Sequence, residues 1–142
     1  MAYFKSTFIL IIALICCFEV FSQNSKHISL GEDSTHLQSM LELAKQKIDN
    51  MEDDLALIIL NRAEKITNSC NCDLYRIKTF ELLNHVYFKK VNYRSQIICL
   101  LELEHLYLKY MRSNKLRTVY NELAKTYILI GDSYKAISYY YE

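Results

Sequence analysis

Residues 116–142 read LRTVYNELAKTYILIGDSYKAISYYYE, and this stretch decides the fold. Its first part carries Tyr120, Leu123, Ala124 and Tyr127, which fall at positions i, i+3, i+4 and i+7. That spacing places the four side chains on one face of an α-helix with 3.6 residues per turn. The first part of the stretch is therefore predicted to be a helix with one buried face.

A tight turn and a second helix are predicted to follow. Gly131 supplies the permissive backbone that a sharp turn requires. Asp132 is placed to cap the next helix through its side-chain oxygen. On that helix Ala136 and Tyr140 lie four residues apart, a small side chain beside a large one. We expect Ala136 to let two antiparallel helices approach closely while Tyr140 fills the space beside it.

The stretch resembles the tetratricopeptide repeat, a helix-turn-helix unit with a fixed order of large, small and aromatic positions. Counting Arg117 as the first position, the residues that fit this pattern are Tyr120, Leu123, Ala124, Tyr127, Gly131, Ala136 and Tyr140. The departure is Tyr120, which stands where Trp is commonest in the family. The resemblance implies a right-handed α-solenoid of stacked helical hairpins.

Two weaker copies of the pattern precede this stretch, at a period of about 40 residues. The middle copy carries Phe80, Leu83, Asn84 and Tyr87, and the first carries Met40, Leu43, Ala44 and Lys47, followed by Ala56, Leu60 and Ala63 on its second helix. Because the standard repeat has about 34 residues, we expect a longer second helix and longer loops. An armadillo-type or other α-hairpin repeat remains an alternative.

The composition suits a packed all-α chain. Proline is absent, only two glycines occur among 142 residues, and 51% of the residues are hydrophobic, including 12 tyrosines. The formal net charge is +1, so no field attracts nucleic acid. The predicted fold class is therefore all-α, with about three helix-turn-helix hairpins.

The N-terminus has the features of a secretory signal peptide. Lys5 gives a positive start, Phe8–Phe18 is an unbroken apolar run, and Val20 and Ser22 place small residues before a cleavage at Gln23. The sequence predicts export to the periplasm or secretion after cleavage near Ser22.

Two alternatives to a cleaved signal remain open. An uncleaved membrane anchor would need about 20 apolar residues, and Glu19 closes the run early. A lipoprotein signal would want a small residue before its cysteine, whereas Cys16 follows Ile15.

The chain is predicted to comprise a signal peptide (1–22), a flexible segment (23–34) and a helical repeat domain (35–142). Thr35 and Gln38 form a capping-box pair that opens the first helix of the domain. Asp53 or Asp54, and later Asn92, are expected to cap following helices. A loop at Asn68–Cys72 is expected to separate the first repeat from the second.

Three cysteines remain after the predicted cleavage: Cys70, Cys72 and Cys99. The favoured interpretation is a reduced or partly oxidised loop pair, with Cys99 a small buried side chain. A Cys70–Cys72 disulfide is the second interpretation, since an exported protein meets oxidising conditions. A metal site is the third, although no further ligands follow at regular spacing.

No catalytic motif appears. Glu102 and His105 make one Glu-x-x-His, which di-iron bundles use in pairs, and only one copy is present. Glu81 and His85 are an i, i+4 pair, most simply a solvated contact. The sequence therefore predicts a protein that is not an enzyme and has no cofactor or metal.

The resemblance implies a partner-binding groove on the first helices of the hairpins. Carried over position by position, it places Gln38, Lys45, Lys78, Glu81, His85, Asn121 and Lys125 in that groove. Lys45, Lys78, Asn121 and Lys125 would then hold a carboxylate or an acidic peptide, because ammonium and amide groups are hydrogen-bond donors. The alternative is that they form the polar faces of surface helices.

The function expected from these features is an exported, non-catalytic scaffold or adaptor that binds a protein or peptide on its concave surface. The alternative is the extracytoplasmic sensory fragment of a larger signalling protein, a sensor kinase or a helix-turn-helix regulator. The last hairpin is expected to be truncated at Glu142, which leaves Tyr139, Tyr140 and Tyr141 without a capping helix. Self-association through that helix is therefore possible.

Overall fold

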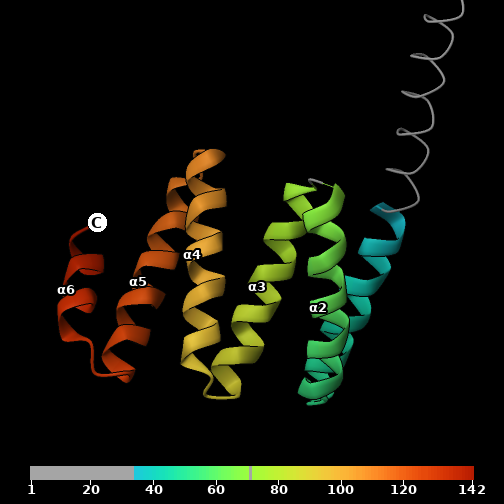
Figure 1. The fold of residues 1–142 in the computed structure, drawn as a ribbon, viewed down its shortest axis with the longest axis horizontal. Helices are drawn as coiled ribbons and strands as arrows, with labels where there is room; N and C mark the ends of the chain where they lie inside the picture. Colours follow the sequence, from blue (N-terminus) through green and yellow to red (C-terminus); the bar gives the residue numbers. More distant parts are fainter. Residues whose placement is uncertain (1–33, 71) are drawn as a thin grey trace, which may run out of the picture. The chain divides into compact units, whose positions relative to one another are not determined.

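The computed structural model describes residues 34–70 and 72–142. Residues 34–49 are helical, and five helices follow in order (Figure 1): α2 (Asp53–Cys70), α3 (Asp73–Lys89), α4 (Tyr93–Lys109), α5 (Ser113–Leu129) and α6 (Ser133–Tyr141). No strand occurs in these residues, so the predicted all-α class is confirmed. The predicted signal peptide and residues 23–33 of the predicted flexible segment lie outside the described residues; residue 34 is helical.

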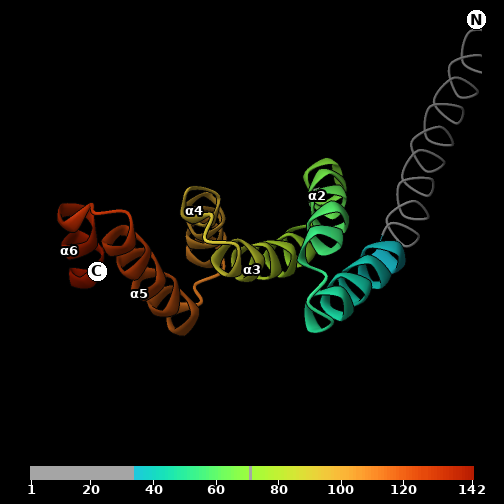
Figure 2. The same ribbon diagram turned by 90° about the horizontal axis from the view of Figure 1, so that it is seen from below.

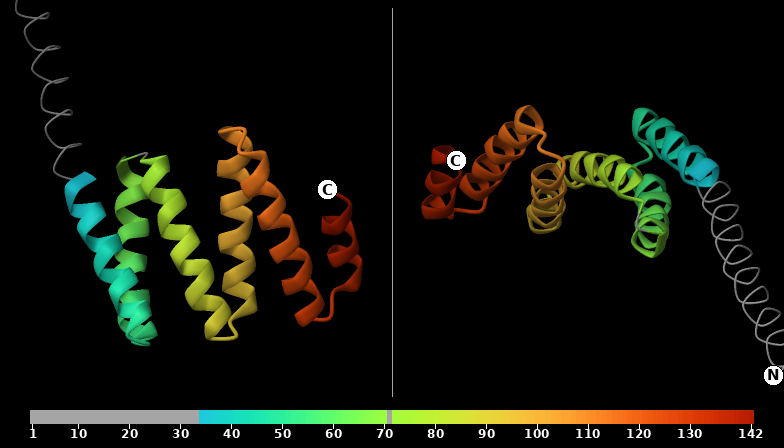
Figure 3. Two further views of the ribbon diagram at one scale, coloured as in Figure 1. Left: turned by 180° about the vertical axis from the view of Figure 1, so that it is seen from behind. Right: turned by 90° about the horizontal axis from the view of Figure 1, so that it is seen from above.

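Residues Leu37–Glu142 form one compact unit, and within it each helix packs against the next in the chain. Figure 2 and the right panel of Figure 3 show residues 37–49, α3 and α5 on one side of this unit, with α2 and α4 on the other. Alternate helices therefore share a side. This arrangement brings side chains of α3 and α5 toward a common surface, although α4 lies between these helices in the sequence.

Four of the turns between helices share one backbone conformation. Among the described residues, positive φ occurs at Met51 (62°), Val91 (58°), Met111 (51°) and Gly131 (83°). At the last turn the Gly131 N–H donates to the Ile128 carbonyl at 3.0 Å, and the Asp132 N–H donates to the Tyr127 carbonyl at 2.9 Å. This pair of bonds is the Schellman motif that ends helices, and the same pair closes the turns at Met51, Val91 and Met111.

The longer loops expected from the repeat length are wrong, and the extra length lies in both helices of a hairpin instead of in the second alone. Helices α3, α4 and α5 each have 17 residues, and a three-residue turn separates each from the next. From α3 to α5 the period arises from helices of equal length joined by three-residue turns of one kind. The expected loop at Asn68–Cys72 is correspondingly shorter, because α2 runs to Cys70.

Two of the predicted caps are confirmed. The Asn92 side chain accepts from the Ser95 N–H at 3.3 Å, and the Asp132 side chain accepts from the Lys135 N–H at 3.1 Å. Asp53 and Asp54 lie inside the first turn of α2 instead of capping it, where their charge still favours the positive end of the helix dipole. Thr35 is itself helical, so the predicted capping box does not mark the start of that helix.

The core is formed by one face of every helix, and small residues lie in it as predicted. Ala56, Ala63 and Ala124 are fully buried and Ala136 is nearly so. Near Ala136 the prediction is wrong for Tyr140, which is half exposed. Its neighbour Tyr139 fills the space.

Tyr139 is the aromatic residue that packs against α5. Its ring stacks on Tyr127 with centroids 5.6 Å apart and lies 5.9 Å from the Tyr120 ring. The residue three positions after Ala136, and not the one four positions after it, therefore faces α5. Period alone cannot choose between the two, because both neighbours lie close to the same helix face.

One property of the helices bears on membranes. Among the residues that the structure describes, no helix has the length and apolar character needed to cross a bilayer.

Candidate ligand-binding surface

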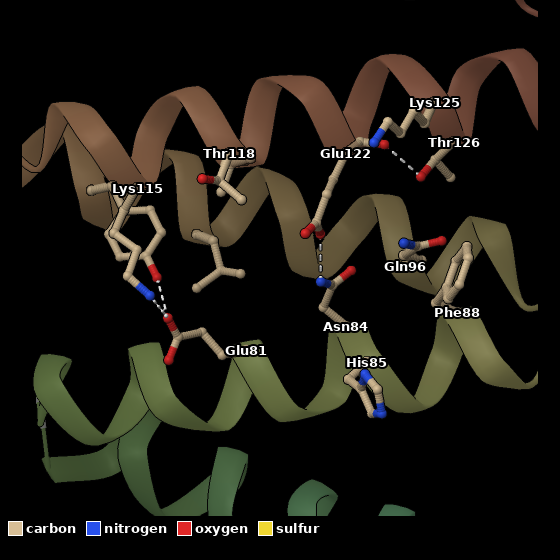
Figure 4. Close-up of a pocket in the computed structure, with 13 residues that line it drawn as sticks. Glu81, Asn84, His85, Phe88, Gln96, Lys115, Thr118, Glu122, Lys125 and Thr126 are labelled. Atoms are coloured by element: carbon tan, nitrogen blue, oxygen red, sulfur yellow. Dashed lines mark hydrogen bonds and ion pairs between the residues drawn. The ribbon is translucent and has the colours of Figure 1, made fainter.

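The larger cavity of the compact unit has a volume of about 590 Å³ and lies between α3 and α5, with α4 beneath. Its lining residues are Glu81, Asn84, His85, Phe88, Gln96, Leu103, Tyr107, Lys115, Thr118, Val119, Glu122, Lys125 and Thr126 (Figure 4). Ligand pockets typically measure about 300–1,000 Å³, so this cavity is large enough to receive part of a peptide.

A smaller cavity of about 360 Å³ lies between residues 37–49 and α3. Its lining residues are Gln38, Leu41, Glu42, Lys45, Lys78, Glu81 and Leu82. Glu81 lines both cavities. The two cavities therefore adjoin along α3.

The structure distributes the predicted groove residues over both cavities. Gln38, Lys45 and Lys78 line the smaller one, His85 and Lys125 line the larger one, and Glu81 lines both. Asn121 is exposed on α5 and lines neither cavity.

The four residues expected to hold a carboxylate or an acidic peptide do not line a single cavity. Lys45 and Lys78 share the smaller cavity with Glu42 and Glu81. Lys125 lines the larger one. The four residues are therefore spread along the surface of several helices, and neither cavity is lined by all of them.

Glu81 is the most connected side chain of the surface. Its Oε1 accepts from the Tyr107 hydroxyl at 2.6 Å and from Lys115 Nζ at 3.0 Å. The expected contact of Glu81 with His85 is replaced by these bonds to α4 and α5. Burial, together with the bond to Glu81, raises the pKa of the Tyr107 hydroxyl, so Tyr107 stays a donor at neutral pH.

A second polar contact crosses the larger cavity. Asn84 Nδ2 on α3 donates to Glu122 Oε2 on α5 at 2.7 Å, as Figure 4 shows. The other atom of the amide, Asn84 Oδ1, is buried and has no hydrogen-bond partner in the described residues. In the repeat pattern, Asn84 stands at a position where a small residue is expected. The structure shows that it joins the two helices.

Gln96 is a candidate functional residue that the sequence pattern did not predict. It lies on α4 in the lining of the larger cavity and is 3% exposed, and its Oε1 is buried with no hydrogen-bond partner in the described residues. A signal was present: Gln96 lies three and four residues before Cys99 and Leu100, which are buried on the same helix face. An amide on an apolar face is unusual and points to a polar partner.

Glu102 and His105 have different surroundings in the structure. Arg76 Nη2 lies 2.7 Å from Glu102 Oε2, and His105 is exposed. In residues 34–70 and 72–142, no group of three or more His, Cys, Asp or Glu residues is placed to hold a metal ion.

The favoured interpretation of the cysteine pair, a reduced or partly oxidised loop, is wrong. Cys70 and Cys72 form a disulfide, which was the second interpretation, and their Cα atoms are 5.2 Å apart. The end of α2 and the start of α3 meet at this point, which brings the two residues within disulfide range. Cys99 is a free, buried thiol as expected, and burial raises its pKa to about 12.

Comparison of the chain with protein-family models, with curated proteins and with solved structures finds no match.

Proposed function

We propose that this chain is an exported, non-catalytic scaffold that binds a protein or peptide on the surface formed by residues 37–49, α3 and α5. The observation that supports the proposal is the pair of adjoining cavities on that surface, which share Glu81. Two cavities in a row suit an extended chain better than a compact small molecule, because successive side chains of a peptide need successive pockets.

The proposed architecture is a right-handed α-solenoid of hairpins similar to tetratricopeptide repeats. Equal helices, recurring turns and alternate helices on one side are what such a repeat needs. In a solenoid the first helices of successive hairpins line a continuous surface, and a partner would lie along it.

Selection from a random peptide library tests this function. The purified chain should enrich peptides, and filling the larger cavity by Thr118→Trp should abolish their binding. Lys65→Trp is the matched control, since Lys65 is exposed on α2 and outside both cavities. Circular dichroism should show that both variants keep their helices. A library that yields no peptide sensitive to Thr118→Trp would refute the function.

Export is part of the same proposal and is tested separately. The residues that support it are the positive start at Lys5, the apolar run Phe8–Phe18 and the small residues before Gln23. N-terminal sequencing of the protein recovered from its native cells should begin at or near Gln23. Recovery of a chain that still begins at Met1, in the membrane fraction, would favour an uncleaved anchor.

A further inference from the structure

Two side chains that line the larger cavity carry buried acceptors that have no donor in the described residues. These atoms are Asn84 Oδ1 and Gln96 Oε1, and both side chains line the cavity. The Gln96 side chain belongs to a residue that is only 3% exposed. A buried acceptor without a donor raises the free energy of the folded chain. A ligand that brings N–H groups to this place would recover that free energy.

The other groups around these acceptors also favour a cation. The Glu122 carboxylate takes one bond from Asn84 and has further lone pairs on both oxygens. Phe88 is 53% exposed and lines the same cavity, so one face of its ring is accessible. Aromatic rings attract guanidinium and ammonium groups through their negative faces. An acceptor pair, a carboxylate and an open aromatic ring thus line one cavity.

The cations of the cavity do not reverse this preference. The positive charge of Lys115 is compensated by its ion pair with Glu81, in which Lys115 Nζ lies 3.0 Å from Glu81 Oε1. Lys125 is exposed, so water and salt screen its charge. A carboxylate ligand would meet the Glu122 carboxylate, which repels it.

We propose that the larger cavity binds an arginine side chain of the partner, with donors directed at Gln96, Asn84 and Glu122 and the guanidinium plane on Phe88. Arginine fits better than lysine because it presents five N–H donors in a planar fork and stacks on aromatic rings. This inference rests on the proposed function and names the side chain that the surface selects. It replaces the acidic ligand expected from the lysines.

Titration of the purified full chain with three defined peptides tests the inference. Each probe is an acetylated, amidated pentapeptide of alanine whose central residue is arginine, citrulline or glutamate. Nuclear magnetic resonance follows the side-chain amide signals of Asn84 and Gln96. The arginine peptide should shift both signals, with the citrulline peptide at least about tenfold weaker and the glutamate peptide without effect, because charged hydrogen bonds are stronger than neutral ones.

Three variants make the test specific. Gln96→Leu and Glu122→Gln should each weaken the arginine peptide about tenfold. Lys125→Gln should leave its affinity unchanged or raise it, because a neighbouring cation opposes a guanidinium. Lys65→Gln on α2 is the control with unchanged affinity. A loss of arginine-peptide binding in Lys125→Gln would overturn the assignment.

The outcomes separate this inference from the proposed function. Shifts of the Asn84 and Gln96 signals by the glutamate peptide and not by the arginine peptide would overturn the arginine site and leave a peptide-binding surface. Library peptides that bind the cavity but lack arginine would also overturn the arginine site and leave a peptide-binding surface. If no pentapeptide shifts these signals, the arginine site is refuted, whereas the proposed function depends on the library result.

Discussion

Lys109 Nζ, in the last turn of α4, lies 2.5 Å from Asp73 Oδ2, in the first turn of α3. One helix earlier in the chain, Lys89 of α3 lies 2.8 Å from Asp53 of α2. Both pairs span 36 residues. The recurrence shows that neighbouring helices pack in the same register. Each pair also sets a carboxylate at a helix N-terminus and an ammonium at a C-terminus, where the helix dipoles favour them.

Asp73 should make stability depend on pH. Hydrogen bonds from Lys109 and from the Tyr110 hydroxyl hold the pKa of this buried carboxylate below its ordinary value of 3.8. A depressed pKa means that the stabilisation is complete above the unfolded-state value and is lost as pH falls through the folded-state value. We expect Asp73→Asn to lower the urea midpoint at pH 7, with the difference from the original chain shrinking below about pH 4.

Asp54→Asn is the matched control for this measurement. Asp54 pairs with Lys90, but its side chain is 86% exposed, so the pair is expected to contribute little. Equal decreases of the urea midpoint at pH 7 in Asp54→Asn and Asp73→Asn would contradict the special role of Asp73.

Val91 is expected to lower stability through its backbone. It occupies the left-handed region at φ 58°, where a β-branched residue is disfavoured. We expect Val91→Gly to raise the free energy of unfolding by about 1 kcal/mol, as measured by urea denaturation. Val91→Ala should change it less, because alanine keeps the Cβ that is strained there. A loss of stability in Val91→Gly would refute this account.

The contact between α5 and α6 should not tolerate larger side chains in place of its alanines. Ala124 on α5 and Ala136 on α6 are buried, and α5 packs against α6. Ala136→Leu or Ala124→Leu is expected to cost about 1–3 kcal/mol by overpacking, which thermal unfolding would detect. Ser138→Leu, at an exposed position of the same helix, serves as the control. Unchanged melting temperatures for both alanine variants would refute the contact.

Cys99 should react slowly with thiol reagents in the folded protein. Burial raises its pKa from 9.0 to about 12, and only the thiolate is the nucleophile. At pH 8 the thiolate fraction is then about a thousandfold below that of an unperturbed thiol. Iodoacetamide labelling followed by peptide mass spectrometry should show Cys99 protected in buffer and labelled in urea. Rapid labelling in buffer would show that the thiol is accessible.

Much of the fold was predictable because apolar spacing and turn chemistry are local. The spacing of Leu123, Ala124 and Tyr127 predicts a helix with one buried face, and all three side chains are buried. Asn92 and Asp132 cap as expected, since capping needs only the following residues. The turn length was mispredicted because Val91 and Met111 adopt positive φ without being glycine.

The candidate site was predictable only in part. The resemblance to tetratricopeptide repeats implied that Glu81, His85 and Lys125 belong to a binding groove, and these residues line the larger cavity. It could not identify Gln96, because this residue belongs to α4 and enters the cavity from beneath. Which side chain of another helix closes a cavity depends on packing between helices, and one helix's periodicity carries no information about it.

The sequence by itself determined the helical class, the order of the helices, the buried alanines and the caps at Asn92 and Asp132, since each depends on residues within a few positions of one another. Only the tertiary structure decided that Tyr139 and not Tyr140 packs on Tyr127. It alone brought Asn84 to Glu122, 38 residues away in the chain. The physical reason is that the register between two packed helices is set by their whole interface, so a contact across it is not encoded in either helix alone.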